Sequence, residues 1–224
     1  MPLRVIAWIN DTELAHKFLE LARILGIRVE IPRLLVSICQ DSNSLVVTDD
    51  VEIAAEMDKN RKCRVVLLRA RDTLSNLITA VSEFVGTPSE IVVGVDLGKE
   101  KLAYVVIVAG IVIDYGICIN CIKEFAKRIC RLKNHRIFVG IGYTMSVSDN
   151  ALRLYELLRE CGINVSIVDE RKSNKTILMG LRGSEMLRKT DLRAAAIVAL
   201  RSRSGKYAPI SLISRRVDER CQRP

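Results

Sequence analysis

The chain has 224 residues and a formal net charge of +9, and 49% of its residues are hydrophobic and 27% charged. This length suits one large domain or two small ones, and the composition excludes a disordered chain. The longest apolar run, at 104–113, is far shorter than the ~20 residues of a membrane span, and the first nine residues lack a signal-peptide pattern, so we expect a cytoplasmic protein without a membrane partner.

The first 86 residues alternate short apolar strands with amphipathic helices. The pattern predicts strands at 5–9, 28–31, 44–47 and 65–68, and helices at about 12–25, 51–58 and 74–85. Such alternation is typical of a small α/β domain with a mainly parallel sheet. The segment lacks a phosphate-binding glycine motif. Asp49 and Asp50 follow a strand; a metal site is one interpretation, and capping of the next helix is the one we favour.

The turn-rich stretch Gly86-Thr87-Pro88-Ser89 predicts a boundary between domains at 1–87 and 88–224. Strands at 90–96, 101–109 and 111–119 follow, and the short gaps between them permit only antiparallel hairpins. A helix capped by Asn120, a strand at 136–141, a helix capped by Ser148, a strand at 163–168 and a helix at 191–203 complete the order β-β-β-α-β-α-β-α. This is the order of the RNase H-like fold, which has a mixed sheet.

The excess positive charge lies in the second part of the chain. Residues 1–89 contain 11 lysines and arginines and 12 acidic residues, whereas residues 90–224 contain 24 and 14. A single basic cluster is often only a solvated face, but an imbalance over a whole domain favours a polyanionic partner. We therefore expect a nucleic acid, DNA or RNA, as the partner.

Four acidic residues stand at predicted strand ends and at a helix start. Asp96 ends an almost wholly apolar strand, Asp169 and Glu170 end the fifth strand of the second domain, and Asp191 lies in the first turn of the last helix. Each has an ordinary alternative: a turn residue, a solvated strand end, or an acid that interacts with the helix dipole. The fold would bring all of them to one edge, where carboxylates can hold Mg²⁺ or Mn²⁺ in a two-metal nuclease site.

The sequence around these acids matches the pattern of a known family. The matching stretches are Val95-Asp96-Leu97-Gly98, Phe138-Val139-Gly140-Ile141-Gly142, Val168-Asp169-Glu170-Arg171 and Asp191-Leu192-Arg193-Ala194-Ala195-Ala196. Together they resemble the YqgF/RuvX branch of the RuvC-like superfamily over about residues 90–203. The resemblance implies a metal-dependent nuclease or resolvase-like protein that acts on branched DNA or precursor ribosomal RNA. It also implies Asp96, Asp169 or Glu170, and Asp191 as catalytic metal ligands, and a homodimer.

The chain departs from that family at two places. Lys172-Ser173-Asn174 replaces the threonines that usually follow Asp-Glu-Arg, and the fourth strand lacks both the family's proline and the glutamate of RuvC resolvases. A catalytically degraded protein that binds nucleic acid or acts as a scaffold is therefore the alternative. An ATP-using phosphotransferase of the actin-like fold starts with a similar hairpin, but it needs a second such domain and a second phosphate loop, which we do not find.

A basic segment follows the fifth strand. Residues 171–206 contain ten lysines and arginines against Glu185 and Asp191, and Gly180 and Gly183 suggest a loop beside the acids. We expect this loop to contact phosphates, with a solvated loop as the alternative. The predicted nucleic-acid-binding residues are Arg171, Lys172, Lys175, Arg182, Arg188, Lys189 and Arg193.

The seven cysteines are scattered through apolar segments. We expect buried free thiols. Cys118 and Cys121 form a single C-x-x-C motif without a second pair or clustered histidines, which argues against zinc and leaves a redox pair as the alternative.

Overall fold

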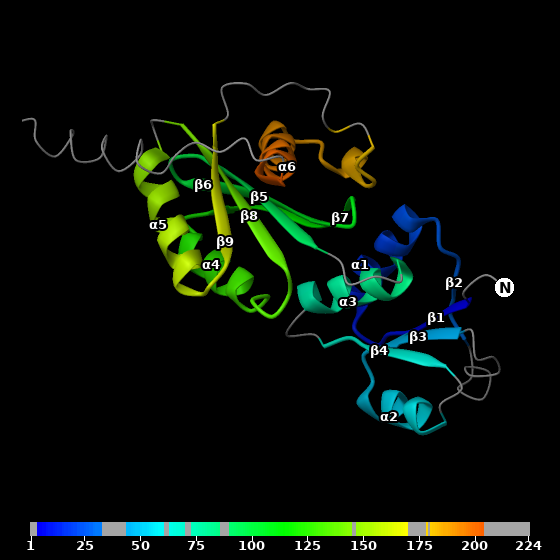
Figure 1. Cartoon of the computed structure of the whole chain (residues 1–224). Helices are drawn as coiled ribbons and strands as arrows, with labels where there is room; N and C mark the ends of the chain where they lie inside the picture. The colour runs from blue at the N-terminus through cyan, green and yellow to red at the C-terminus, as the bar shows by residue number, and fades with distance from the viewer. Residues whose placement is uncertain are drawn as a thin grey trace, which may run out of the picture. The chain divides into compact units, whose positions relative to one another are not determined.

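A computed structural model of the chain describes residues 4–32, 44–60, 63–69, 73–85, 90–144, 147–169, 178 and 180–203. The chain divides into two compact units, Met1–Pro88 and Ser89–Pro224 (Figure 1). None of the helices in the described ranges is long and apolar enough to cross a membrane.

The N-terminal unit is a parallel sheet between two layers of helix. Its elements are β1 (Arg4–Trp8), α1 (Thr12–Leu25), β2 (Val29–Glu30), β3 (Ser44–Thr48), α2 (Val51–Asn60), β4 (Arg64–Leu67) and α3 (Thr73–Val85). The strands lie in the order β2-β1-β3-β4, and every neighbouring pair is parallel. Phe18 of α1 packs on one face of the sheet, and Met57 of α2 packs on the other. The predicted parallel α/β arrangement is confirmed.

The adjacent acids Asp49 and Asp50 serve the backbone of this unit. Asp50 accepts a hydrogen bond from the backbone N–H of Glu52 at 2.9 Å, which caps the start of α2. Asp49 accepts hydrogen bonds from the N–H groups of Asn10 and Asp11 at 2.8 and 2.7 Å. The prediction of helix capping is confirmed for Asp50, whereas the Asp49 carboxylate accepts from the backbone that precedes α1.

The C-terminal unit is built on a five-stranded mixed sheet. Its elements are β5 (Ile91–Leu97), β6 (Lys101–Val108), β7 (Ile111–Ile119), α4 (Ile122–Cys130), β8 (Ile137–Tyr143), α5 (Ser148–Glu160), β9 (Asn164–Asp169), a 3₁₀ helix η6 (Ser184–Met186) and α6 (Thr190–Arg203). The sheet order is β7-β6-β5-β8-β9. β6 is antiparallel to both β5 and β7, whereas β8 and β9 run parallel to β5. This mixed α/β arrangement is consistent with an RNase H-like fold.

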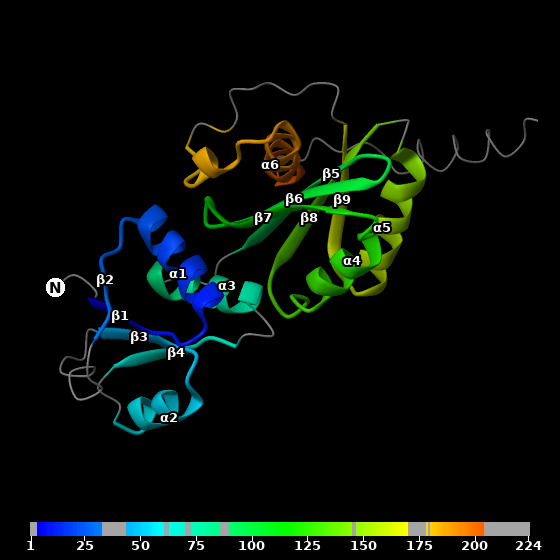
Figure 2. The same ribbon diagram turned by 180° about the vertical axis from the view of Figure 1, so that it is seen from behind.

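The helices of this unit cover the two faces of the sheet separately. α6 packs on β5, β6 and β8, whereas α4 and α5 pack together on the opposite face (Figures 1 and 2). On that face the Phe125 ring of α4 packs against the Tyr104 ring of β6, with centroids 5.2 Å apart and the ring planes tilted by 42°. Arg128 donates hydrogen bonds to the Tyr104 hydroxyl at 2.6 Å and to Asp114 at 2.8 Å. Burial raises the pKa of Tyr104 above its ordinary value, and the negative charge of Asp114 adds to the shift.

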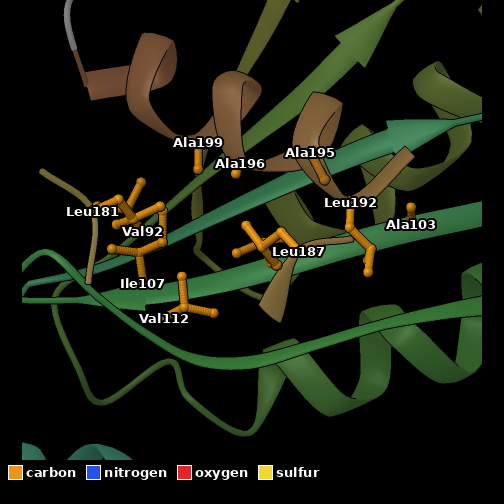
Figure 3. Close-up of a cluster of buried hydrophobic side chains, with 11 residues drawn as sticks. Val92, Ala103, Ile107, Val112, Leu181, Leu187, Leu192, Ala195, Ala196 and Ala199 are labelled. Atoms are coloured by element: carbon orange, nitrogen blue, oxygen red, sulfur yellow. The ribbon is translucent and has the colours of Figure 1, made fainter. Parts of the chain in front are cut away.

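α6 lies close to the sheet because the residues at the contact are small. A Cβ atom placed on Gly94 of β5 would lie 1.9 Å from the carbonyl oxygen of Ala195 and 2.6 Å from the amide nitrogen of Ala199. Figure 3 shows the alanines of α6 above the strands, with Leu192 beside Ala103 at one end of the cluster and Ala199 near Val92 at the other. Glycine in the strand and alanine in the helix therefore set the distance between the two layers.

The four cysteines that the structure describes in this unit are bonded, so the prediction of free thiols is wrong for them. Cys118 is bonded to Cys121, and Cys130 is bonded to Cys161, with Cα atoms 5.9 and 5.7 Å apart. Cys63 of the N-terminal unit is also disulfide-bonded. The Cys130–Cys161 bridge joins the end of α4 to the end of α5. The prediction of burial is also wrong, because all five described cysteines are half-buried. Only the packing of α4 against α5 brings the sulfurs of Cys130 and Cys161 together.

Candidate nucleic-acid interface

Asp96 lies at the carboxyl end of β5, on the face of the sheet that α6 covers. Side chains alternate between faces along a strand, and Val92 and Gly94 of the same strand both contact α6. Asp96 is therefore the next position on that face, and it is half-buried. Its partner on β6 is Ala103, which belongs to the core beneath α6.

α6 runs antiparallel to β5, and its first turn therefore lies at the Asp96 end of the sheet. The last residue of α6, Arg203, forms an ion pair at 3.1 Å with Glu90, which directly precedes β5. Leu192, near the start of α6, packs in the same cluster as Ala103, the strand partner of Asp96 (Figure 3). Asp191 precedes Leu192 and is half-buried. Asp96 and Asp191 thus lie at one end of the unit, as the sequence predicts.

The next strand of the sheet, β8, has no side chain level with Asp96. Val95 of β5 pairs with Ile141 of β8, so the residue level with Asp96 on β8 is Gly142, which has no side chain to bind a ligand. Gly142 pairs with Val168 of β9, and the backbone of Asp169 lies one position further along, opposite Tyr143. Glu170 lies outside the described residues.

A divalent metal is implied by the family resemblance, and the described acids do not fit one by themselves. Among the residues that the structure describes, no three histidine, cysteine, aspartate or glutamate side chains lie close enough together to hold a metal ion. Two carboxylates, Asp96 and Asp191, and a glycine on the intervening strand are too few ligands for a Mg²⁺ site built from protein oxygens. No catalytic step through a metal is therefore assigned to this edge.

Three of the predicted basic residues surround the start of α6. Arg188 and Lys189 directly precede the helix and are exposed. Arg193, in the first turn, is also exposed, and its Nε atom donates a hydrogen bond to the Leu187 carbonyl oxygen at 2.9 Å. This bond holds the preceding connection against the helix. The charges are thus placed beside the edge that carries Asp96.

Arg182 lies at the other end of the sheet. Its backbone N–H donates to the Gly110 carbonyl oxygen at 3.1 Å, and it bridges Ile111 at the start of β7. Ile111 pairs with Val108, which pairs with Ile91 at the start of β5. Asp96 lies five positions further along β5 than Ile91, or about 17 Å. The other predicted basic residues, Arg171, Lys172 and Lys175, lie outside the described part of the chain.

Sequence reasoning missed a second basic cluster at the Asp96 end of the sheet. Its members line a pocket of about 260 Å³ and come from the β5–β6 hairpin, the start of α4 and α5: Lys99, Lys101, Lys123 and Arg153. These residues are spread over more than fifty positions and no local charge run joins them. Only the two lysines of the hairpin offered a signal in the sequence.

Comparisons with known proteins add little to this description. The chain matches no protein-family model and no curated protein. Among solved structures it is similar to the RuvC structure from Thermus thermophilus, with 18% sequence identity and a TM-score of 0.38, over 53% of this chain and 99% of that chain. A TM-score this low does not establish a shared fold.

Proposed function

We propose that the C-terminal unit binds structured nucleic acid, branched DNA or precursor ribosomal RNA, at the edge formed by the end of β5 and the start of α6. The observation that carries the proposal is the group of exposed basic side chains Arg188, Lys189 and Arg193 around the first turn of α6. The excess positive charge of residues 90–224 supports the same partner.

The chemistry of this edge favours contacts to the phosphate backbone. Lysine and arginine neutralise phosphates and release bound counterions, which makes binding strongly dependent on salt and largely independent of sequence. Only 4% of the residues of the chain are aromatic, so stacking of unpaired bases contributes little. We therefore expect the shape of the nucleic acid, rather than its base sequence, to determine affinity.

The binding proposal is tested with the full chain and two labelled probes, a four-way DNA junction and an RNA stem-loop. In Arg188→Gln/Lys189→Gln, the slope of log affinity against log salt should become shallower by about 1.8 for DNA, because each lost phosphate contact removes about 0.9. The matched control, Lys59→Gln/Arg69→Gln, removes two exposed charges from the N-terminal unit and should leave the slope unchanged. Equal slopes for the parent and Arg188→Gln/Lys189→Gln would overturn the proposal.

A second candidate function is metal-dependent cleavage of the bound nucleic acid. The placement of Asp96 and Asp191 at the same end of the sheet favours it. A metal site there would need Asp169 and Glu170 as further ligands beside these two acids, as the resemblance implies, with Mg²⁺ or Mn²⁺ bound. If the acids do not complete a site, the unit is the binding or scaffold protein of the alternative interpretation.

Cleavage is tested by incubating the full chain with the same two probes in Mg²⁺ and in Mn²⁺. We expect Asp96→Asn and Asp191→Asn to abolish cleavage while they retain binding. Asp58→Asn, an exposed acid of the N-terminal unit, serves as the control and should cut like the parent. An absence of cutting by the parent, or undiminished cutting by Asp96→Asn, would reject the nuclease and leave the binding function.

Two further properties belong to this proposal. A protein that acts on both arms of a branched substrate needs two copies of its site, so we propose a homodimer, which sedimentation of the full chain would test. We also propose a cytoplasmic location.

A further inference from the structure

We infer that the pocket between the β5–β6 hairpin, the start of α4 and α5, called here the hairpin pocket, binds a phosphate group. We assign this group to the backbone of the nucleic acid held at the Asp96 edge, and the assignment of that source rests on the proposed function. The pocket is lined by residues 97–102, 120–124, Asn150 and Arg153 and has a volume of about 260 Å³.

The charge of the hairpin pocket favours an anion. Lys99, Lys101, Lys123 and Arg153 line it together with two acids, Glu100 and Glu124. All six side chains are exposed. Within the described residues, none of the four cations takes part in a salt bridge. Their ammonium and guanidinium groups are therefore available to neutralise a phosphate.

The walls of the pocket are tied to one another. The Asn120 N–H donates to the Glu100 carbonyl oxygen at 2.8 Å, which joins the end of β7 to the hairpin. The Asn150 side chain donates to the Lys99 carbonyl oxygen at 2.9 Å, which joins α5 to the hairpin. The Cys118–Cys121 disulfide links the end of β7 to the start of α4. A pocket fixed in this way loses less entropy when a ligand binds.

The local backbone explains why α4 begins one residue later than its sequence predicts. The predicted cap, Asn120, has a left-handed backbone with φ of 51°, and the N-cap of α4 is Cys121. Cys121 has no side-chain oxygen, and it makes no side-chain hydrogen bond to the first-turn N–H groups. These groups adjoin the pocket and add a partial positive charge to that of the four cations.

The position of the pocket indicates why its phosphate belongs to the same nucleic acid as the Asp96 edge. Leu97 lines the pocket and is the neighbour of Asp96 on β5, with its side chain on the opposite face of the sheet. The two sites are therefore separated by one strand. A backbone that crosses the end of β5 passes from the α6 side to the hairpin pocket. The volume is below the ~300–1,000 Å³ of ordinary small-molecule sites, which suits one phosphodiester.

The test compares Lys99→Gln/Lys123→Gln with Lys127→Gln/Lys133→Gln, which removes two exposed lysines outside the pocket from the same unit. The probes are the four-way DNA junction, the RNA stem-loop and inorganic pyrophosphate, each added to the full chain. We expect the pocket variant to bind the DNA junction with a salt slope shallower by about 1.8 and to bind pyrophosphate at least threefold more weakly, while the control matches the parent. Unfolding curves of both variants should match that of the parent, because the substituted side chains are exposed.

The outcomes separate this inference from the proposed function. If the pocket variant loses pyrophosphate affinity but binds both nucleic acids like the parent, the assignment to the nucleic-acid backbone is overturned and the phosphate is a free one. If neither ligand is affected, the hairpin pocket is not a phosphate site. If the parent binds no nucleic acid, the proposed function fails, and the pyrophosphate measurement alone decides whether the pocket binds phosphate.

Discussion

Replacing Gly94 with alanine should strongly destabilise the C-terminal unit. The added Cβ would lie 1.9 Å from the Ala195 carbonyl oxygen, about 1.5 Å short of the 3.4 Å at which ordinary contacts begin, and 2.6 Å from the Ala199 amide nitrogen. Both contacts are to the backbone of α6, so no side-chain rotation relieves them. Overpacking in a core typically costs about 1–3 kcal/mol. Because α6 must move as a whole here, we expect at least about 3 kcal/mol.

The assay is urea unfolding of the full chain, followed by far-ultraviolet circular dichroism and by the fluorescence of the single tryptophan, Trp8. Trp8 lies in β1 and reports on the N-terminal unit, whose transition should not change. A loss of about 3 kcal/mol lowers the urea midpoint of the C-terminal unit by about 1–3 M for the slopes usual in proteins. Gly94→Ala should also weaken nucleic-acid binding, since displacement of α6 moves the basic side chains at its start.

Gly98→Ala is the matched control. Gly98 directly follows β5, but a Cβ atom there would lie 3.5 Å from its nearest atom, the Lys101 carbonyl oxygen, which is an ordinary contact. We expect its midpoint to match that of the parent within experimental error. A Gly94→Ala protein as stable as Gly98→Ala would show that α6 does not pack on β5 as described.

Two more predictions concern stability. The Cys130–Cys161 disulfide joins residues 31 positions apart, whereas Cys118 and Cys121 are 3 positions apart. Loop entropy therefore predicts that replacing each pair by serine lowers the free energy of unfolding by about 3.7 kcal/mol for Cys130–Cys161 and about 1.6 kcal/mol for Cys118–Cys121. Equal losses in urea unfolding would contradict this prediction. Burial raises the pKa of Tyr104 in the folded state, so its contribution to stability is present below about pH 10, the unfolded value, and is lost as the pH rises through the folded pKa. Tyr104→Phe should flatten the decline in stability at alkaline pH, and an unchanged decline would exclude Tyr104 as its source.

The order of elements and the parallel or antiparallel sense of the strands follow from local patterns. Apolar residues at helical or strand spacing, together with gaps too short for a crossover, predict the three antiparallel strands and the parallel strands after them, and the structure has them. The end of the first helix before Gly26 is also predicted. In the structure Gly26 has a φ of 70°, a conformation that glycine adopts without strain. Each of these features depends on residues close together in the chain.

The candidate site was predictable only in part. The sequence places Asp96 and Asp191 at a strand end and a helix start, and their common end of the sheet follows once the fold is known. It does not show that Arg182 lies about 17 Å along the strands from Asp96, because this follows from the pairing of Arg182 with Ile111 at the start of β7. The position of a loop residue depends on which strand the loop pairs with, and no local pattern encodes that choice.

The sequence by itself determined the types of the elements, their order and the surplus of positive charge in residues 90–224. Only the tertiary structure decided which surfaces touch: that Cys130 meets Cys161, that Gly94 receives the backbone of α6, and that separate lysines and Arg153 line one pocket. The physical reason is that the spacing of apolar residues indicates whether a segment is a helix or a strand and which of its faces is buried. It does not record the partner against which that side packs, since many apolar faces are chemically alike.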